Sequence, residues 1–224
     1  MASVKNQLTG YAVLMALILS IPVYGLVKTG MNQRRTVNAV AAKVDKKQQL
    51  HDAMFRLWIE HGVWTHEYIV ATLHDLANAK QAAERLLKNQ DDIGSAIAPF
   101  YGKKAGAELT RLLKDHILIA VDLVDAVKKN DKAKGKTADQ KWHKNAQDIA
   151  LFLSKANPFW PQQDMVNMLN QHLSLTSQQV VARKSANWQK DIQLYDEILR
   201  QLTTMAFMLA DGIVQQMPEK FATA

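Results

Sequence analysis

The sequence has no cysteine and few residues that break helices. Its 224 residues include no Cys, 9 Gly and 5 Pro, while 48% are hydrophobic. Without Cys the chain cannot form disulfides, thiolate-ligated zinc or iron–sulfur sites, or a cysteine nucleophile. The scarcity of Gly and Pro excludes collagen-like and low-complexity classes, and the length is ample for one or two domains.

Several patterns that mark enzymes and metal proteins are also missing. There is no Gly-rich phosphate loop, no Gly-x-Ser-x-Gly elbow and no Asp-rich calcium loop. The Glu-x-x-His spacing of ferritin-like di-iron bundles does not occur, and His66-Glu67 lacks the second histidine of a zinc-protease helix. The sequence therefore favours a protein without enzymatic activity.

Apolar residues recur at helical spacing to the end of the chain, whereas no stretch after residue 40 alternates as a strand does. We therefore predict an all-α fold, with one helical bundle domain over residues 48–221 that has four long helices and shorter connecting ones. A capping-box spacing at Thr176 predicts a helix start, and no internal repeat of 20 to 50 residues is evident. The predicted breaks lie at residues 89–91, 99–102, 128–136 and 157–158.

The one long apolar run lies near the N-terminus. After a short tail at 1–7, residues 8–27 supply 20 mostly apolar positions without a charge, enough for about 30 Å of helix. Pro22 and Gly25 within it are tolerated in membrane helices. We predict a single-pass membrane anchor, with a cleaved signal peptide as the alternative.

The flanking charges leave the side of the membrane open. Basic residues are more numerous in the juxtamembrane segment 28–47 than in the tail 1–7, which by the positive-inside rule retains the domain in the cytoplasm. A signal-type leader would export the domain instead. The basic segment would also suit anionic lipid headgroups.

The net charge of +7 does not form a nucleic-acid-binding face. Segments 28–47 and 128–136 carry +5 and +4 of it, which leaves −2 for the rest of the chain. Aromatic residues do not interleave with these lysines, as a platform for stacked bases would require. We expect no nucleic-acid partner, and the sequence names no protein partner.

Histidine is the residue type that points to a site. His61, His116 and His172 each lie on the apolar stripe of a different predicted helix, so all three are expected to face the core. Imidazoles that converge in a bundle core can bind a transition metal or haem iron. Asp191 and Tyr195, at i and i+4 on the last predicted helix, could add an oxygen ligand or orient an imidazole.

The leading hypothesis is a membrane-anchored binding module in which these residues line a pocket for a metal, haem or small polar ligand. In one alternative the histidines are structural, each with a hydrogen-bond partner in the core. The functional surface is then the Met- and Trp-rich helix ends or the lysine-rich stretch 128–136. In another alternative the protein is an enzyme, with His116 as a base that Asp191 orients.

Several motifs follow one another in order along residues 50–221: Arg85-Leu-Leu-Lys-Asn-Gln-Asp-Asp-Ile-Gly94, Pro99-Phe-Tyr-Gly102, Leu112-Leu-Lys-Asp-His-Ile117, Trp142-x-x-Asn-Ala146 and Gly212-Ile-Val-Gln-Gln-Met-Pro218. With these motifs the chain resembles a family of small bacterial helical proteins of uncharacterised function. Members sometimes carry the names glycosyltransferase or acetylglutamate kinase, which imply α/β folds that this sequence does not indicate.

The resemblance also bears on the candidate site. It implies that the three stripe histidines, Asp191 and Tyr195 stand at positions of the family pattern, and that arginine is usual where this chain has His66. Some members look exported, which favours an extracytoplasmic domain.

Overall fold

The computed structural model describes residues 45–222, which are helical almost throughout and confirm the predicted all-α class. The predicted membrane anchor at 8–27 and most of the basic segment 28–47 lie outside the described residues. Within the described part, no helix is both long and apolar enough to cross a bilayer. The helices are α2 (Lys46–Leu73), α3 (Ala79–Tyr101), α4 (Lys103–Lys128), α5 (Lys132–Ala156), α6 (Gln162–Lys184), α7 (Trp188–Gln216) and the short α8 (Pro218–Phe221).

Residues 45–222 contain six long helices where four were predicted, because several predicted interruptions are helical. α3 continues through 89–91, where the amides of Asn89 and Gln90 are buried and bonded instead of exposed in a turn. α5 begins at Lys132 within the lysine-rich stretch, since lysine is a good helix former and Asp131 caps the helix by accepting from the Lys134 backbone N–H at 3.0 Å. Thr176 lies inside α6, so its capping-box spacing does not start a helix.

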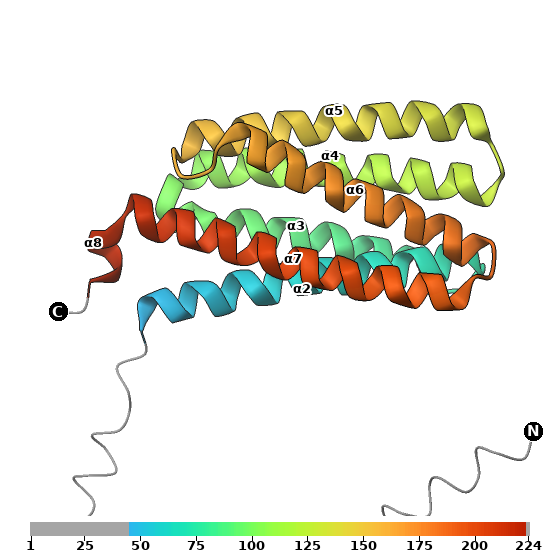
Figure 1. Ribbon diagram of the computed structural model, residues 1–224, viewed down its shortest axis with the longest axis horizontal. Helices are drawn as coiled ribbons and strands as arrows, with labels where there is room; N and C mark the ends of the chain where they lie inside the picture. Colours follow the sequence, from blue (N-terminus) through green and yellow to red (C-terminus); the bar gives the residue numbers. More distant parts are fainter. Residues whose placement is uncertain (1–44, 223–224) are drawn as a thin grey trace, which may run out of the picture. The chain divides into compact units, whose positions relative to one another are not determined.

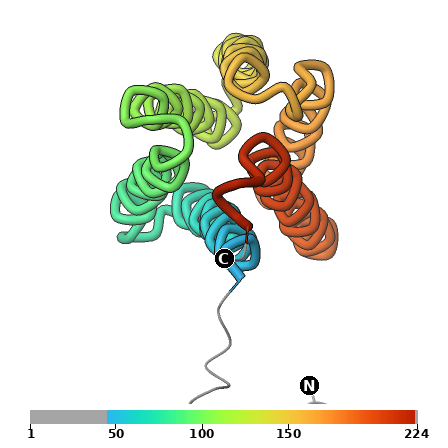
Figure 2. Tube along the Cα trace, turned by 90° about the vertical axis from the view of Figure 1, so that its left-hand side faces the viewer, coloured from blue at the N-terminus to red at the C-terminus, as the bar shows by residue number. Residues whose placement is uncertain are grey.

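The six long helices form a closed ring, seen end-on in Figure 2. Each packs mainly on its neighbours along the chain, and α7 closes the ring against α2. The chain runs up and down through three helical hairpins, α2–α3, α4–α5 and α6–α7 (Figure 1). Helices α2, α4 and α6 also contact one another across the centre. The first helix of each hairpin is therefore the one that reaches the middle of the core.

The three hairpins repeat one another at intervals of 55 and 56 residues. In each, one residue with positive φ ends the first helix: Asp75 (54°), Asn130 (56°) and Ala186 (55°). The next backbone N–H donates to the carbonyl five residues earlier at 2.9 Å in all three turns, as in a Schellman motif. The sequence analysis missed this repeat, because its period exceeds 50 residues and few residue types are kept.

Helices α3 and α4 touch closely at a pair of glycines. A Cβ on Gly106 would lie 2.6 Å from the Gly94 carbonyl oxygen, and a Cβ on Gly94 would lie 2.5 Å from the Gly106 carbonyl oxygen. Both distances are shorter than real Cβ contacts, so only glycine fits on either helix. This contact joins the first hairpin to the second.

Replacing Gly106 by Ala is expected to lower the free energy of unfolding by about 1–3 kcal/mol, because the two backbones must separate. Gly135→Ala is the matched control, since its Cβ would lie 3.8 Å from Ala126 in ordinary contact within α5. That control should gain about 0.5–1 kcal/mol from helix propensity. Urea unfolding followed by circular dichroism measures both, and two changes of the same sign would contradict the assigned contact.

Candidate functional site

His61 on α2, His116 on α4 and His172 on α6 meet in the centre of the ring, and together they are called the histidine layer. The three residues are 3%, 4% and 3% exposed. The ring centroids of His61 and His172 are 5.6 Å apart, and those of His116 and His172 are 6.5 Å apart. All three face the core, as their place on the apolar stripes predicts.

In the second hairpin, the amide of Asn145 on α5 fixes the orientation of His116. Asn145 Nδ2 donates to the Leu112 carbonyl oxygen at 3.0 Å. Asn145 Oδ1, 2.8 Å from His116 Nδ1, is therefore an acceptor. The hydrogen-bond pattern thus assigns the proton of neutral His116 to Nδ1 and leaves Nε2 as an acceptor.

The same arrangement recurs in the third hairpin, where Gln201 on α7 takes the place of Asn145. Gln201 Nε2 donates to the Met168 carbonyl oxygen at 3.2 Å. Its Oε1 lies 3.2 Å from His172 Nδ1 and accepts the proton carried there. In both hairpins the carbonyl belongs to the residue four positions before the histidine, so one amide spans a single helical turn.

Two neighbouring amides share this task in the first hairpin. Asn89 Nδ2 donates to the Leu57 carbonyl oxygen at 3.0 Å, and the Asn89 side chain also hydrogen-bonds to His61. Gln90 Nε2 lies 3.3 Å from His61 Nδ1 but makes two shorter bonds to oxygens, at 2.7 and 3.1 Å. Because an amide nitrogen has two hydrogens, we assign Asn89, 56 residues before Asn145, as the acceptor for His61.

Asn89, Asn145 and Gln201 are called the amide clamps. Sequence reasoning missed them, since Asn89 was read as part of a helix break and the other two as ordinary helix positions. Two signals could have found them: the clamps recur every 56 residues, and Asn145 and Gln201 each lie 29 residues after their histidine.

Burial keeps the histidine layer uncharged at neutral pH. Desolvation lowers the pKa of His116 to about 3 and the pKa of His172 to about 4. Burial, and then the nearby His172 and His116, lower the pKa of His61 well below its usual value. The layer therefore presents neutral imidazoles, the form in which histidine binds metal ions.

The rings are not closed around a metal position. Among residues 45–222 there is no group of three or more His, Cys, Asp or Glu side chains arranged to hold a metal ion. Two imidazoles on one zinc ion place their ring centroids about 5 Å apart, because Zn–N bonds are about 2.0–2.1 Å. The observed separations of 5.6 and 6.5 Å exceed this, so an ion would have to draw the rings inward.

Haem does not fit beside the histidine layer. Cavities of about 20 Å³ lie on the two sides of the layer, one lined by His61 and the other by apolar side chains such as Trp58 and Leu113. Cofactor pockets have volumes of several hundred Å³. The space next to the layer suits a single ion or a water-sized molecule.

Asp191 and Tyr195 do not join the histidine layer. Asp191 is 1% exposed and accepts from Arg183 Nη1 at 2.7 Å, while Tyr195 stacks on His66 with ring centroids 4.1 Å apart. Among the hydrogen bonds within 45–222, neither residue bonds to a histidine of the layer. The reason is position along α7: Asp191 precedes the clamp Gln201 by ten residues, or about 15 Å of helix.

These two residues belong instead to a second polar cluster between α2, α6 and α7. Gln179 Nε2 donates to His66 Nδ1 at 2.9 Å. Burial lowers the pKa of His66, although the nearby Asp191 carboxylate opposes that shift. Arg183, whose guanidinium lies 5.1 Å from the Trp188 ring, supplies the positive charge. Arginine and histidine are therefore both present in this cluster, at residues 183 and 66.

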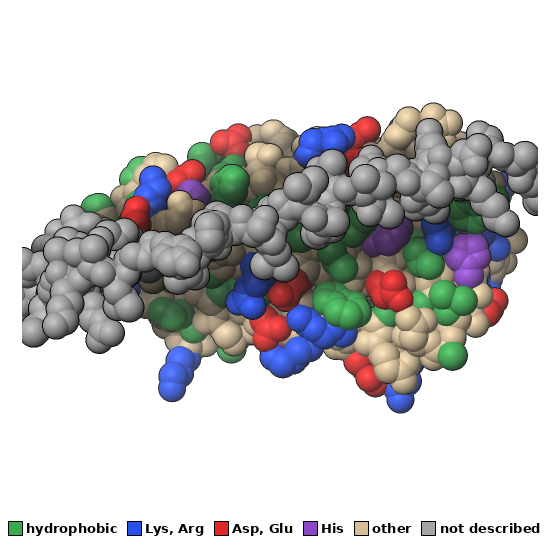
Figure 3. Space-filling model, turned by 90° about the horizontal axis from the view of Figure 1, so that it is seen from below, with side chains coloured by type: hydrophobic (Ala, Val, Ile, Leu, Met, Phe, Trp, Pro, Cys, Tyr) green, Lys and Arg blue, Asp and Glu red, His purple; other side chains and the backbone are tan. Residues whose placement is uncertain are grey.

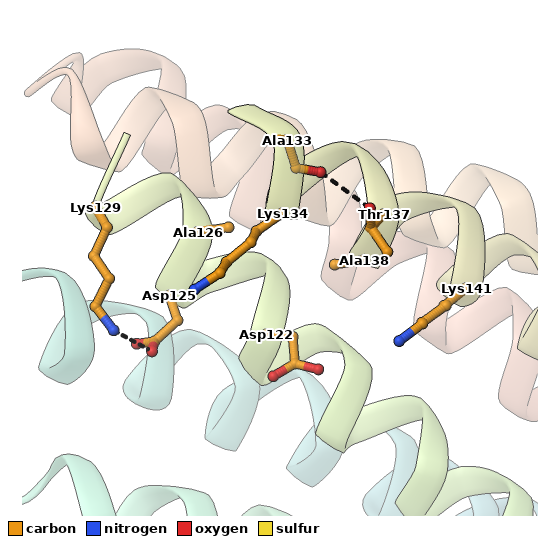
Figure 4. A pocket seen from close by; sticks show the side chains of 9 residues that line it. All are labelled: Asp122, Asp125, Ala126, Lys129, Ala133, Lys134, Thr137, Ala138 and Lys141. Atoms are coloured by element: carbon orange, nitrogen blue, oxygen red, sulfur yellow. Dashed lines mark hydrogen bonds and ion pairs between the residues drawn. The ribbon is translucent and has the colours of Figure 1, made fainter. Parts of the chain in front are cut away.

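Hollows on the outer surface carry mixed charge. A groove of about 460 Å³ lies between α4 and α5 near their turn, and Figure 4 shows its lysine and aspartate side chains. Lys129 there pairs with Asp125 at 2.9 Å. On the face drawn in Figure 3, basic and acidic side chains are likewise interspersed. These surfaces do not favour a ligand of one charge.

Comparison of the chain with protein-family models, curated proteins and solved structures gives no match. The site is therefore interpreted from its own geometry.

Proposed function

We propose that this protein is a binding module whose histidine layer takes one divalent transition-metal ion, zinc or a neighbour in the first-row series. The Nε2 atoms of His61, His116 and His172 would be the ligands. The observation that carries this proposal is the threefold recurrence of an amide clamp. Metal-binding histidines donate the other ring N–H to such a partner, which fixes the tautomer and the ring orientation.

The chemistry of the donor set supports a metal ion over other ligands. Three neutral imidazoles from three hairpins offer acceptor nitrogens that suit zinc, copper, nickel or iron. A cation compensates acceptors in a dry core, where an unpaired acceptor is costly. Because the layer is enclosed, the role proposed is binding, and catalysis is not part of it.

We also propose that residues 8–27 hold the domain at a membrane. The support is the uncharged apolar run, long enough to span the hydrocarbon core, followed by the basic segment 28–47 that suits anionic headgroups. Membership in the helical family named above remains a proposal that rests on the motifs.

Zinc titration against a chromophoric chelator tests the metal proposal. The wild-type protein is expected to take one zinc ion per chain, and His116→Ala to lose that binding. Asn145→Leu should weaken binding about 10- to 100-fold, because the clamp no longer orients the ring. His143→Ala is the control, since this side chain is 43% exposed and far along α5 from the turn of the layer clamp.

Two outcomes would contradict the metal proposal. One is a wild-type protein that takes no zinc, copper, nickel, cobalt or iron. The other is a His116→Ala variant that is still folded and binds as the wild type does. Either result would make the layer a structural element whose amide clamps specify the packing of the hairpins.

A second candidate function is protein interaction, and a specific surface favours it. Near the α2–α3 and α6–α7 turns, Leu76 and Trp188 are 45% and 48% exposed, and Ile192 is 61% exposed. His74 lies 5.9 Å from the Trp188 ring, which places these residues together. Exposed apolar side chains grouped in this way mark interaction sites. Loss of a bound partner in Trp188→Ser, with metal content unchanged, would support it.

A further inference from the structure

One helical turn beyond the histidine layer, toward the hairpin turns, lies a second set of equivalent positions. Thr65, Ala120 and Thr176 each follow a layer histidine by four residues. They border the cavity of about 20 Å³ that also touches His61. This space is called the threonine cavity, and the rest of its lining includes Tyr68 and apolar side chains of α2, α4 and α6.

The two threonine hydroxyls have no partner in the protein. Oγ1 of Thr65 and Oγ1 of Thr176 are buried without a hydrogen bond among residues 45–222, and Thr176 is 3% exposed. Other helical threonines donate to the carbonyl four residues earlier, namely Thr137, Thr203 and Thr204 at 3.1, 2.8 and 3.2 Å. Thr65 and Thr176 differ from these, so their hydroxyls are available to a molecule in the cavity.

The cavity on the other side of the layer provides an internal comparison. It has the same volume of about 20 Å³, but its lining consists of apolar side chains and the tryptophans Trp58 and Trp160. A cavity without polar partners stays dry, whereas a polar cavity of at least about 10–15 Å³ with two to four partners holds a water molecule. The two cavities therefore differ in chemistry and not in size.

We propose that the threonine cavity is a binding site for one water molecule, held by the hydroxyls of Thr65 and Thr176 beside the His61 ring. Each hydroxyl can donate or accept, so a single water can bridge α2 and α6. The bridge links the first and third hairpins at the place where Thr65 and Thr176 make no direct bond. It also places one exchangeable oxygen next to the histidine layer, and it does not depend on a metal ion being bound there.

Water–protein cross-relaxation in the metal-free, full-length protein tests this site. Methyl groups of Val124 and Val180, which line the threonine cavity, are expected to show cross-peaks to a long-lived water. Methyl groups of Leu209 and Met205, which line the apolar cavity, should show none. The double substitution Thr65→Val and Thr176→Val keeps the side-chain shape and should remove the Val124 and Val180 cross-peaks. Thr203→Val, which loses a bonded hydroxyl, should leave them.

A count of bound water gives a second, independent readout. Magnetic relaxation dispersion of water ¹⁷O should show one fewer long-lived water in the double variant than in the wild type. Wild-type protein without cross-peaks at Val124 and Val180 would overturn the proposal, whether or not the double variant folds. An unchanged water count in a folded double variant would overturn it as well.

Discussion

Metal-free protein is expected to lose most of its stability between pH 7 and pH 5. The cause is the histidine layer, whose pKa values are depressed in the folded state, to about 3 for His116 and about 4 for His172. In the unfolded chain a histidine has a pKa of about 6.5. As the pH falls below about 6.5, the unfolded state therefore binds protons that the native state does not, and stability falls with pH.

The expected size of this effect is large. One pKa unit corresponds to about 1.4 kcal/mol, so three buried histidines give a slope of about 4 kcal/mol per pH unit. At pH 5 the loss reaches about 6 kcal/mol, which is comparable with the whole stability of a typical domain. Carboxylates titrate near pH 4 and contribute little in this window.

Urea unfolding at several pH values between 7 and 5, in the presence of a chelator, measures the slope. His116→Gln should reduce it by about one third, because one of the three buried imidazoles is gone. His143→Gln, at an exposed position, should not change it. Stability that is constant from pH 7 to pH 5 would show that the three imidazoles are not buried and neutral.

Asp191→Ala is expected to lower the free energy of unfolding by about 3 kcal/mol. The Asp191 side chain is 1% exposed and its pair with Arg183 is 2.7 Å long, while Arg183 is 21% exposed. Breaking a buried pair typically costs about 3–5 kcal/mol, because one charge is left without its partner. The partial exposure of Arg183 places the effect at the lower end.

Asp148→Ala is the matched control for this substitution. It removes an ion pair with Lys144 in which both side chains are well exposed, at 66% and 44%. Exposed pairs contribute about 1 kcal/mol or less. Thermal or urea unfolding compares the two variants. Equal losses would contradict the assignment of Asp191 as the buried anchor of the second polar cluster.

The helical spacing of apolar residues predicted the fold class, and the details that failed have physical causes. A run such as Asn89-Gln90-Asp91 is typical of a helix break, because such side chains compete for backbone groups. Here Asn89 and Gln90 find partners across the hairpin, so α3 continues. Local spacing cannot reveal such partners, since they lie 29 to 32 residues away in the sequence.

The candidate site was predicted in part for the same reason. The apolar stripes placed His61, His116 and His172 in the core, because a helical stripe determines which side faces inward. The same reasoning did not show how far along each helix the side chains meet. It therefore grouped Asp191 and Tyr195 with the layer, although they lie nearer the α6–α7 turn and contact Arg183 and His66.

The repeat of the hairpin explains why the histidines meet at one level. Each histidine and each positive-φ turn residue recurs after 55 and 56 residues, so the distance from layer to turn is the same in all three hairpins. Packing the hairpins into a ring then brings the layer together at the centre. A period of this length, with changed residue types at most positions, is visible only after the fold is known.

The central claim is that three clamped imidazoles present Nε2 to one metal ion, and the histidine side-chain ¹⁵N spectrum tests it most directly. In metal-free protein at pH 7, His61, His116 and His172 are expected as neutral rings with the proton on Nδ1. Addition of one equivalent of zinc should then shift Nε2 of all three together. Rings with the proton on Nε2, or zinc that shifts only the other histidines, would contradict the account.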